Sequence, residues 1–129
     1  MRILVVDDNA SERLYLIAML KRLGIEEIVQ VENGSKALTL LKKDKDFDMI
    51  MIDWNMPVMS GTETISVLSY QGNKVPIVMM SGRDRPQDVE RALKMGVNAY
   101  LTKPFTIDHL AEKINFIANE RSDNLAQDG

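Results

Sequence analysis

Five polar side chains with complementary chemistry each follow a short apolar run of this chain. They are Asp7 and Asp8 (after residues 3–6), Asp53 (after 49–52), Ser81 (after 76–80) and Lys103 (shortly after 99–101). Three carboxylates within a few ångströms of one another repel, by about 4 kcal/mol for each pair at ~4 Å and an effective dielectric of roughly 20. Such a cluster either retains protons or binds a cation.

The residue types select the cation. Carboxylate oxygens with no thiolate or imidazole beside them favour a hard ion, Mg²⁺ with Mn²⁺ as the alternative, and the chain contains no cysteine. Protein-bound Mg²⁺ usually keeps several waters and is completed by phosphate oxygens. Lys103 and the Ser81 hydroxyl supply donors for such oxygens. Asp53 is then the expected nucleophile towards phosphorus, forming an aspartyl phosphate.

A parallel sheet would bring these residues together. The four apolar runs, with a fifth at 28–31, predict five buried strands. Helical patterns lie between and after them, at 9–24, from 35 to the charged stretch 42–46, and at 62–71, 86–96 and 106–119. This alternation predicts an α/β fold, a doubly wound five-stranded parallel sheet with five helices on its two faces. In such a sheet all the carboxyl ends of the strands lie at one edge, where ligands bind.

Two helices carry specific expectations. Asn9 and Glu12 have the spacing of a capping box at the start of the first helix. The fourth helix is expected to begin at Pro86, with Val89, Ala92 and Leu93 facing inward. The pair Asn33-Gly34 is expected to form a turn before the second helix.

The chain is expected to form one domain over residues 1–120, followed by a polar tail, 121–129, that is predicted to be disordered. The net charge of −3 gives no global electrostatic case for binding nucleic acid or an anionic membrane. No apolar run has the length of a signal peptide or a membrane span. These features are compatible with a cytoplasmic protein.

The acids Asp7-Asp8, the stretch DWNMP from Asp53 to Pro57, Ser81, and KPF from Lys103 together resemble the receiver domain of two-component response regulators. The likeness is greatest to stand-alone CheY-like proteins and extends from residue 2 to about 119. It implies a flavodoxin-like strand order, 2-1-3-4-5. It also implies a single-domain response regulator that accepts a phosphoryl group from a histidine kinase or a histidine phosphotransfer protein. A downstream target would bind the face made by the fourth helix, fifth strand and fifth helix, in chemotaxis-type or phosphorelay signalling.

The resemblance also implies the metal ligands. Asp8, Asp53 and the backbone carbonyl of Asn55 would hold Mg²⁺, with Asp7 acting partly through water. The bond between Lys103 and the following proline is expected to be cis.

Further roles concern the phosphoryl group. Lys103 would pair with it, Ser81 would bond to it after transfer, and the backbone of Gly82 would line its site. Tyr100 matches the aromatic switch position of the family. Ser81 stands where threonine is commoner, and Arg83 stands where CheY-like proteins often have an acid, so we expect Arg83 to set the phosphoryl lifetime.

Three alternatives fit less well. Haloacid-dehalogenase-type phosphotransferases need a general-acid Asp two residues after the nucleophile, and this chain has Asn55 there. No multiple-turnover enzyme is therefore expected, only self-phosphorylation and slow autodephosphorylation. A partner-binding pseudo-receiver has no need of three acids, and a flavodoxin-like cofactor carrier would need a Gly-rich phosphate loop after the first strand.

The first helix carries two apolar stripes. Leu16, Met19, Leu20 and Leu23 are expected to face inward. Ala10, Leu14 and Ile17 form a second stripe beside the acids, a candidate docking stripe for a helical kinase or phosphotransfer partner.

Two aromatic side chains carry simpler expectations. Trp54 is expected to be partly exposed in the loop after Asp53. His109, the single histidine, is expected to lie at the surface.

Overall fold

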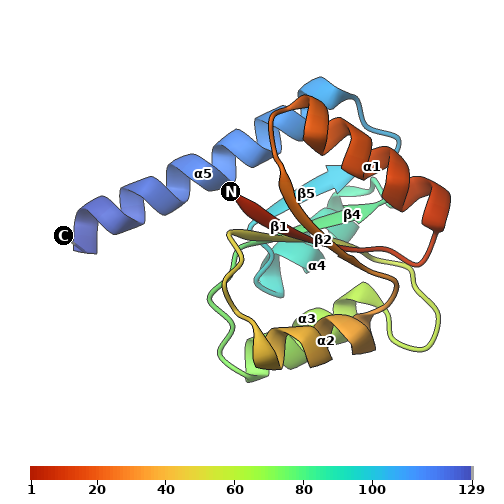
Figure 1. Cartoon of the computed structure of the whole chain (residues 1–129). Coiled ribbons are helices and arrows are strands. Elements are labelled where there is room, and N and C mark those ends of the chain that lie inside the picture. The colour runs from red at the N-terminus through yellow and green to blue at the C-terminus, as the bar shows by residue number, and fades with distance from the viewer. Residues whose placement is uncertain (129) are drawn as a thin grey trace.

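The fold is a five-stranded parallel sheet in the order β2-β1-β3-β4-β5, as the computed structural model shows for residues 1–128 (Figure 1). The strands are β1 (Arg2–Val6), β2 (Glu27–Val31), β3 (Met49–Asp53), β4 (Ile77–Ser81) and β5 (Ala99–Thr102). Every residue of β3 and β4 is buried, because helices cover both faces of the sheet. The predicted doubly wound fold and the strand order are confirmed.

The helices follow the strands in turn. They are α1 (Ala10–Arg22), α2 (Gly34–Lys43), α3 (Gly61–Tyr70), α4 (Pro86–Lys94) and α5 (Ile107–Asp128). Successive residues of a strand point to opposite faces, so Ile3 and Val5 pack in the core beneath α1 and α5. Leu4 and Val6 pack in the core beneath α2, α3 and α4. The chain thus forms a sheet between two layers of helices (Figure 1).

Side-chain caps fix where three of the helices begin. Asn9 caps α1 and Asn33 caps α2, each accepting a hydrogen bond from a backbone N–H in the first turn. Ser60 and Glu63 form a complete capping box at α3. The prediction of a turn at Asn33-Gly34 is therefore wrong, because Asn33 is an N-cap and Gly34 the first residue of α2.

Helix α4 is held to the sheet by a narrow stripe. Pro86 begins it as predicted, but Arg85 before it provides no side-chain cap, and Ala92 is the one fully buried residue within the helix. Val89 is half-buried. Leu93 is 48% exposed, so its predicted inward position is wrong. The helix packs on the sheet through Ala92. Leu93, the next residue, lies about 100° further round the helix axis and therefore points away from the sheet.

Helix α5 is longer than predicted, continuing past residue 119 to Asp128. No Gly or Pro interrupts the chain between them, and Arg121 ties this part of the helix to the start of β3. Its guanidinium donates to the Asp48 carbonyl at 2.9 Å and pairs with the Asp48 carboxylate at 3.3 Å. Disorder of 121–129 in solution stays a prediction, and Gly129 lies outside the described residues.

The inward stripe of α1 is largely as predicted. Leu16, Met19 and Leu20 are buried, whereas Leu23 is 36% exposed because it lies at the C-cap, after the last helical residue. His109 on α5 is exposed as expected. Across residues 1–128, no helix combines the length and the apolar character needed to cross a membrane.

Candidate functional site: an acid and lysine pocket at the sheet edge

The carboxyl ends of the central strands bring the predicted polar residues to one edge of the sheet. Asp7 directly follows β1, while Asp53 and Ser81 are the last residues of β3 and β4. Backbone hydrogen bonds extend the strand pairing beyond these ends. The Trp54 N–H donates to the Met80 carbonyl at 2.9 Å, and the Lys103 N–H donates to the Ser81 carbonyl at 2.7 Å.

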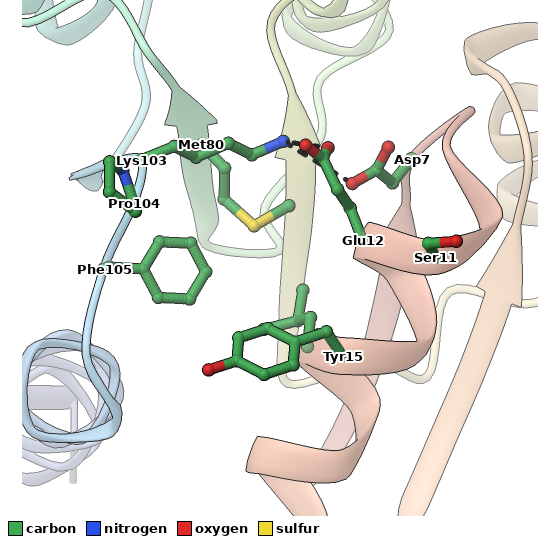
Figure 2. A pocket seen from close by; sticks show the side chains of 9 residues that line it. Asp7, Ser11, Glu12, Tyr15, Met80, Lys103, Pro104 and Phe105 are labelled. Atoms are coloured by element: carbon green, nitrogen blue, oxygen red, sulfur yellow. Dashed lines mark hydrogen bonds and ion pairs between the residues drawn. The ribbon is translucent and has the colours of Figure 1, made fainter.

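Lys103 lies among three carboxylates. Its Nζ is 2.8 Å from Glu12 Oε2, 3.1 Å from Asp53 Oδ1 and 3.7 Å from Asp7 Oδ2. Figure 2 shows the lysine reaching across from the β5–α5 segment towards Glu12 on α1 and Asp7. One oxygen from each acid lies within 4.8 Å of the others. The pocket therefore carries more negative than positive charge.

Burial makes this charge costly. It raises the pKa of the Asp53 carboxyl to about 6, from an ordinary 3.8, although Lys103 lowers it. Burial also raises the pKa of Asp7, partly opposed by the Asn9 N–H that donates to Asp7 Oδ1 at 2.9 Å. Burial by itself lowers the pKa of Lys103, but the hydrogen bond to Glu12 and the neighbouring acids outweigh it and the net pKa is raised. These are the electrostatics of a site that favours an added cation.

The acid cluster differs from the predicted one in one member. Asp8 is exposed and is not among the clustered acids that the structure describes. Glu12, which sequence reasoning assigned to a capping box, takes that place. Because Asp7 accepts the Asn9 N–H, the Glu12 side chain is left free to reach Lys103. Its signal in the sequence was a carboxylate in the first turn of the helix that begins beside Asp7.

Ser81 and Tyr100 both contact the loop after β4. The buried Ser81 Oγ accepts from the Arg83 N–H at 3.0 Å, and the Tyr100 hydroxyl donates to the Arg83 carbonyl at 2.6 Å. Tyr100 is only 8% exposed, and burial raises the pKa of its hydroxyl. The Tyr100 ring is therefore buried in the same structure in which the Ser81 hydroxyl accepts a hydrogen bond from the loop after β4. Gly82 between them is exposed.

Trp54 is buried, so the prediction of a partly exposed ring is wrong. It continues the alternation of Ile50 and Ile52 into the core beneath α2, α3 and α4. The Arg83 guanidinium lies 4.9 Å from its ring centroid and the Tyr100 ring packs edge-on at 6.2 Å. Arg91 of α4 approaches the same ring at 6.0 Å.

The guanidinium of Arg83 also reaches the residue after the tryptophan. Its NH2 donates to Asn55 Oδ1 at 3.4 Å, a long hydrogen bond. The side chain of Arg83 therefore contacts the loop after β3, and its backbone contacts Ser81 and Tyr100.

The loop after β3 folds back closely on Asp53. The Gly61 N–H donates to the Trp54 carbonyl at 2.8 Å, and a Cβ on Gly61 would lie 2.3 Å from the Asp53 carbonyl oxygen. Gly61 is needed for this approach. Val58 in the same loop has φ of 70° and is 96% exposed, a backbone conformation rare for a β-branched residue. The bond between Lys103 and Pro104 is cis, as expected.

An apolar cavity of about 520 Å³ adjoins the lysine. Tyr15 and Leu16 of α1, Met80 of β4 and Phe105 line it, and Asp7, Glu12 and Lys103 form its polar end (Figure 2). The cavity therefore runs beside α1 and reaches the acids at its polar end.

Fold and site together define an α/β domain with an acid and lysine pocket at the carboxyl edge of a flavodoxin-like sheet. The response regulator receiver domain family has a model that matches residues 3–115, and the chain belongs to this family. Within it the chain is CheY-like. It is 38% identical over 116 residues to a chemotaxis protein CheY homolog of Campylobacter jejuni, covering 88% of this chain and 89% of that protein.

Solved structures agree with this assignment. The receiver domain of the Francisella response regulator 1452 superimposes with a TM-score of 0.86 at 30% identity, covering 93% of this chain and 98% of that one. The receiver domain of a sensor histidine kinase from Pseudomonas aeruginosa, described with magnesium coordinated in its active site cleft, gives a TM-score of 0.79 at 30% identity. That match covers 91% of this chain and 97% of the other.

Proposed function

We propose that this protein is a cytoplasmic response regulator that accepts a phosphoryl group on Asp53 from a histidine kinase or a histidine phosphotransfer protein. The observation that carries the proposal is the 3.1 Å contact between Lys103 Nζ and Asp53 Oδ1 in a pocket with two further carboxylates. The similarity of the chain to chemotaxis proteins favours a chemotaxis-type output over a phosphorelay.

In the proposed reaction a carboxylate oxygen of Asp53 attacks the phosphorus of a phosphohistidine. The new P–O bond forms as the P–N bond breaks, and the imidazole nitrogen leaves with the bonding electron pair and takes up a proton. The Lys103 ammonium and the Ser81 hydroxyl stabilise the oxygens of the transferred group. Water later attacks the phosphorus, which releases inorganic phosphate and restores the carboxylate.

The donor set fits Mg²⁺, with Mn²⁺ as the alternative. Asp7 and Asp53 offer buried carboxylate oxygens with raised pKa values, and carboxylates are the ligands that Mg²⁺ prefers. The backbone carbonyl of Asn55 and, after rotation of its exposed side chain, Asp8 would complete the protein ligands. When bound, the ion neutralises charge on the oxygens of the phosphoryl group. The magnesium described for the Pseudomonas receiver domain supports this assignment.

Labelling with acetyl phosphate in Mg²⁺ tests the acceptor. We expect Asp53→Asn to abolish an acid-stable, base-labile adduct that the wild-type protein forms. Asp46→Asn, which removes an exposed acid from the loop before β3, is the matched control and should label normally. An Asp53→Asn variant that labels at the wild-type rate would show that the acceptor lies elsewhere.

The phosphodonor is proposed to dock on α1. Leu14 and Tyr15 are 59% and 64% exposed, and Tyr15 lines the cavity beside Lys103. Ala10 is exposed as predicted, but Ile17 is 8% exposed and belongs to the core, so its predicted place in the docking stripe is wrong. The exposed apolar surface of α1 therefore centres on Leu14 and Tyr15.

The output face is proposed to be α4, β5 and α5, with Tyr100 as the switch. Because Tyr100 is already buried while Ser81 contacts the loop, we propose that the phosphoryl group stabilises this ring position. Coupling between two sites is reciprocal, so a target bound to that face favours phosphorylation by the same factor. Beryllofluoride should shift the amide signals around Tyr100, and an unchanged spectrum with the ligand bound would contradict this role.

A further inference from the structure

Glu12 lies where a capping residue would be, yet it caps nothing that the structure describes. It is the acid of the first turn of α1, and a capping-box acid there would accept the Asn9 N–H. That N–H donates instead to Asp7 Oδ1 at 2.9 Å. The Glu12 carboxylate points across the pocket and accepts from Lys103 Nζ at 2.8 Å (Figure 2).

This contact is the shortest of the three that Lys103 makes with acids. The lysine is nearer to Glu12 than to Asp53, at 3.1 Å, or to Asp7, at 3.7 Å. The side chain of Glu12 is 51% exposed, whereas those of Asp53 and Asp7 are 11% and 2% exposed. Glu12 can therefore release the lysine by a rotation in solvent, while the two aspartates are fixed by the core around them.

We propose, on the basis of the function proposed above, that Glu12 is a positioning residue for phosphoryl transfer. It holds the Lys103 ammonium and adds a negative charge beside Asp53. The charge favours binding of a divalent cation. A phosphoryl group on Asp53 brings further negative oxygens that need the same lysine, so Glu12 repels that group and competes with it for Lys103. Glu12 thus favours cation binding and opposes phosphorylation.

The neutral variant Glu12→Gln separates these two effects. Binding of Mn²⁺, read from the electron paramagnetic resonance signal of the free ion, requires no phosphorylation, and we expect its dissociation constant to rise several-fold. With Mg²⁺ raised to saturation, weaker cation binding no longer limits the reaction. Labelling of Asp53 by acetyl phosphate should then be at least about threefold faster than in the wild-type protein.

Glu12→Asp tests position apart from charge. It keeps the carboxylate but shortens the side chain by one methylene, so it is expected to bind Mn²⁺ within about twofold of wild type. It should lose the contact with Lys103 and label faster than wild type. Glu26→Gln makes the same change of net charge at an exposed site beyond the far end of α1, and both measurements should be unchanged.

Two results would overturn the inference. One is a Glu12→Gln variant that labels at the wild-type rate in saturating Mg²⁺, and the other is one that binds Mn²⁺ as the wild type does. In either case labelling of Asp53 in the wild-type protein would leave the proposed function intact. Absence of that labelling would refute the proposed function itself, and the inference with it.

Discussion

Because Asp53 is buried, its negative charge lowers the stability of the folded protein, and the substitution Asp53→Asn should remove this effect. The pKa of the carboxyl is raised by burial to about 6, from an ordinary value of 3.8. Between these pH values the folded chain binds more protons than the unfolded chain. The stability that the protonated acid provides is therefore complete below about pH 4 and is lost as the pH rises through about 6.

The magnitude follows from the size of the shift. Each pKa unit corresponds to about 1.4 kcal/mol, so a shift of about two units amounts to roughly 3 kcal/mol at pH 8. Asn is close in shape to the protonated acid and carries no charge. When no divalent cation is present, Asp53→Asn should therefore be more stable than wild type by about 1 kcal/mol at pH 4.5 and by about 3 kcal/mol at pH 8.

Urea unfolding followed by circular dichroism measures this difference, with chelator present and at pH values from 4.5 to 8. The control variant Asp46→Asn removes an exposed acid, and its difference from wild type in the free energy of unfolding should not grow in this way. Mg²⁺ at about a hundred times its dissociation constant should add roughly 2.7 kcal/mol to the free energy of unfolding of the wild type. This would narrow the difference in stability between the wild type and Asp53→Asn. A gap that is constant over the whole range, or a wild type that is the more stable protein at pH 8, would refute the reasoning.

Three further predictions concern the residues around the pocket. Arg83→Ala should shorten the phosphoryl lifetime several-fold, about 1 kcal/mol in the barrier, because the arginine covers Asn55 and hinders the attacking water; a longer lifetime of labelled protein would show that it assists the water. Leu14→Lys should slow phosphotransfer from a partner while acetyl phosphate labelling is unchanged, and equal losses in both assays would indicate misfolding. Val58→Asn should raise the free energy of unfolding by about 1 kcal/mol, because Asn adopts positive φ more readily; an unchanged urea midpoint would contradict this.

The strands and the polar residues at their ends were predictable because both depend on local patterns. An unbroken apolar run such as 49–52 indicates a strand covered on both faces, and the residue after it must lie at the sheet edge. Parallel alignment then brings Asp53, Ser81 and Lys103 together whatever the loops do. The sequence alone therefore predicted that these side chains share one edge of the sheet, as the structure shows.

What escaped prediction depends on side-chain direction. Asp7 and Asp8 are adjacent in sequence, but neighbouring residues of an extended chain point to opposite sides, and only Asp7 is buried. Glu12 lies in the site because the Asn9 N–H, which Glu12 was expected to cap, donates to Asp7 instead. Trp54 was predictable in principle, since it extends the period of two set by Ile50 and Ile52 beyond the assumed end of the strand.

Helix α4 buries few of its own side chains against the rest of the domain. It has one fully buried residue, Ala92, and no side-chain cap at its start, and Val89 and Met95, which pack against the core, are only partly buried. Elements with few buried contacts open at low free energy. A coupling of 1–3 kcal/mol is typical between two sites, and burial of one methylene group contributes about 0.8 kcal/mol. If Asp53 is the phosphoacceptor, as proposed, a coupling of this size would be enough to shift α4 between positions while the strands beneath it stay in register.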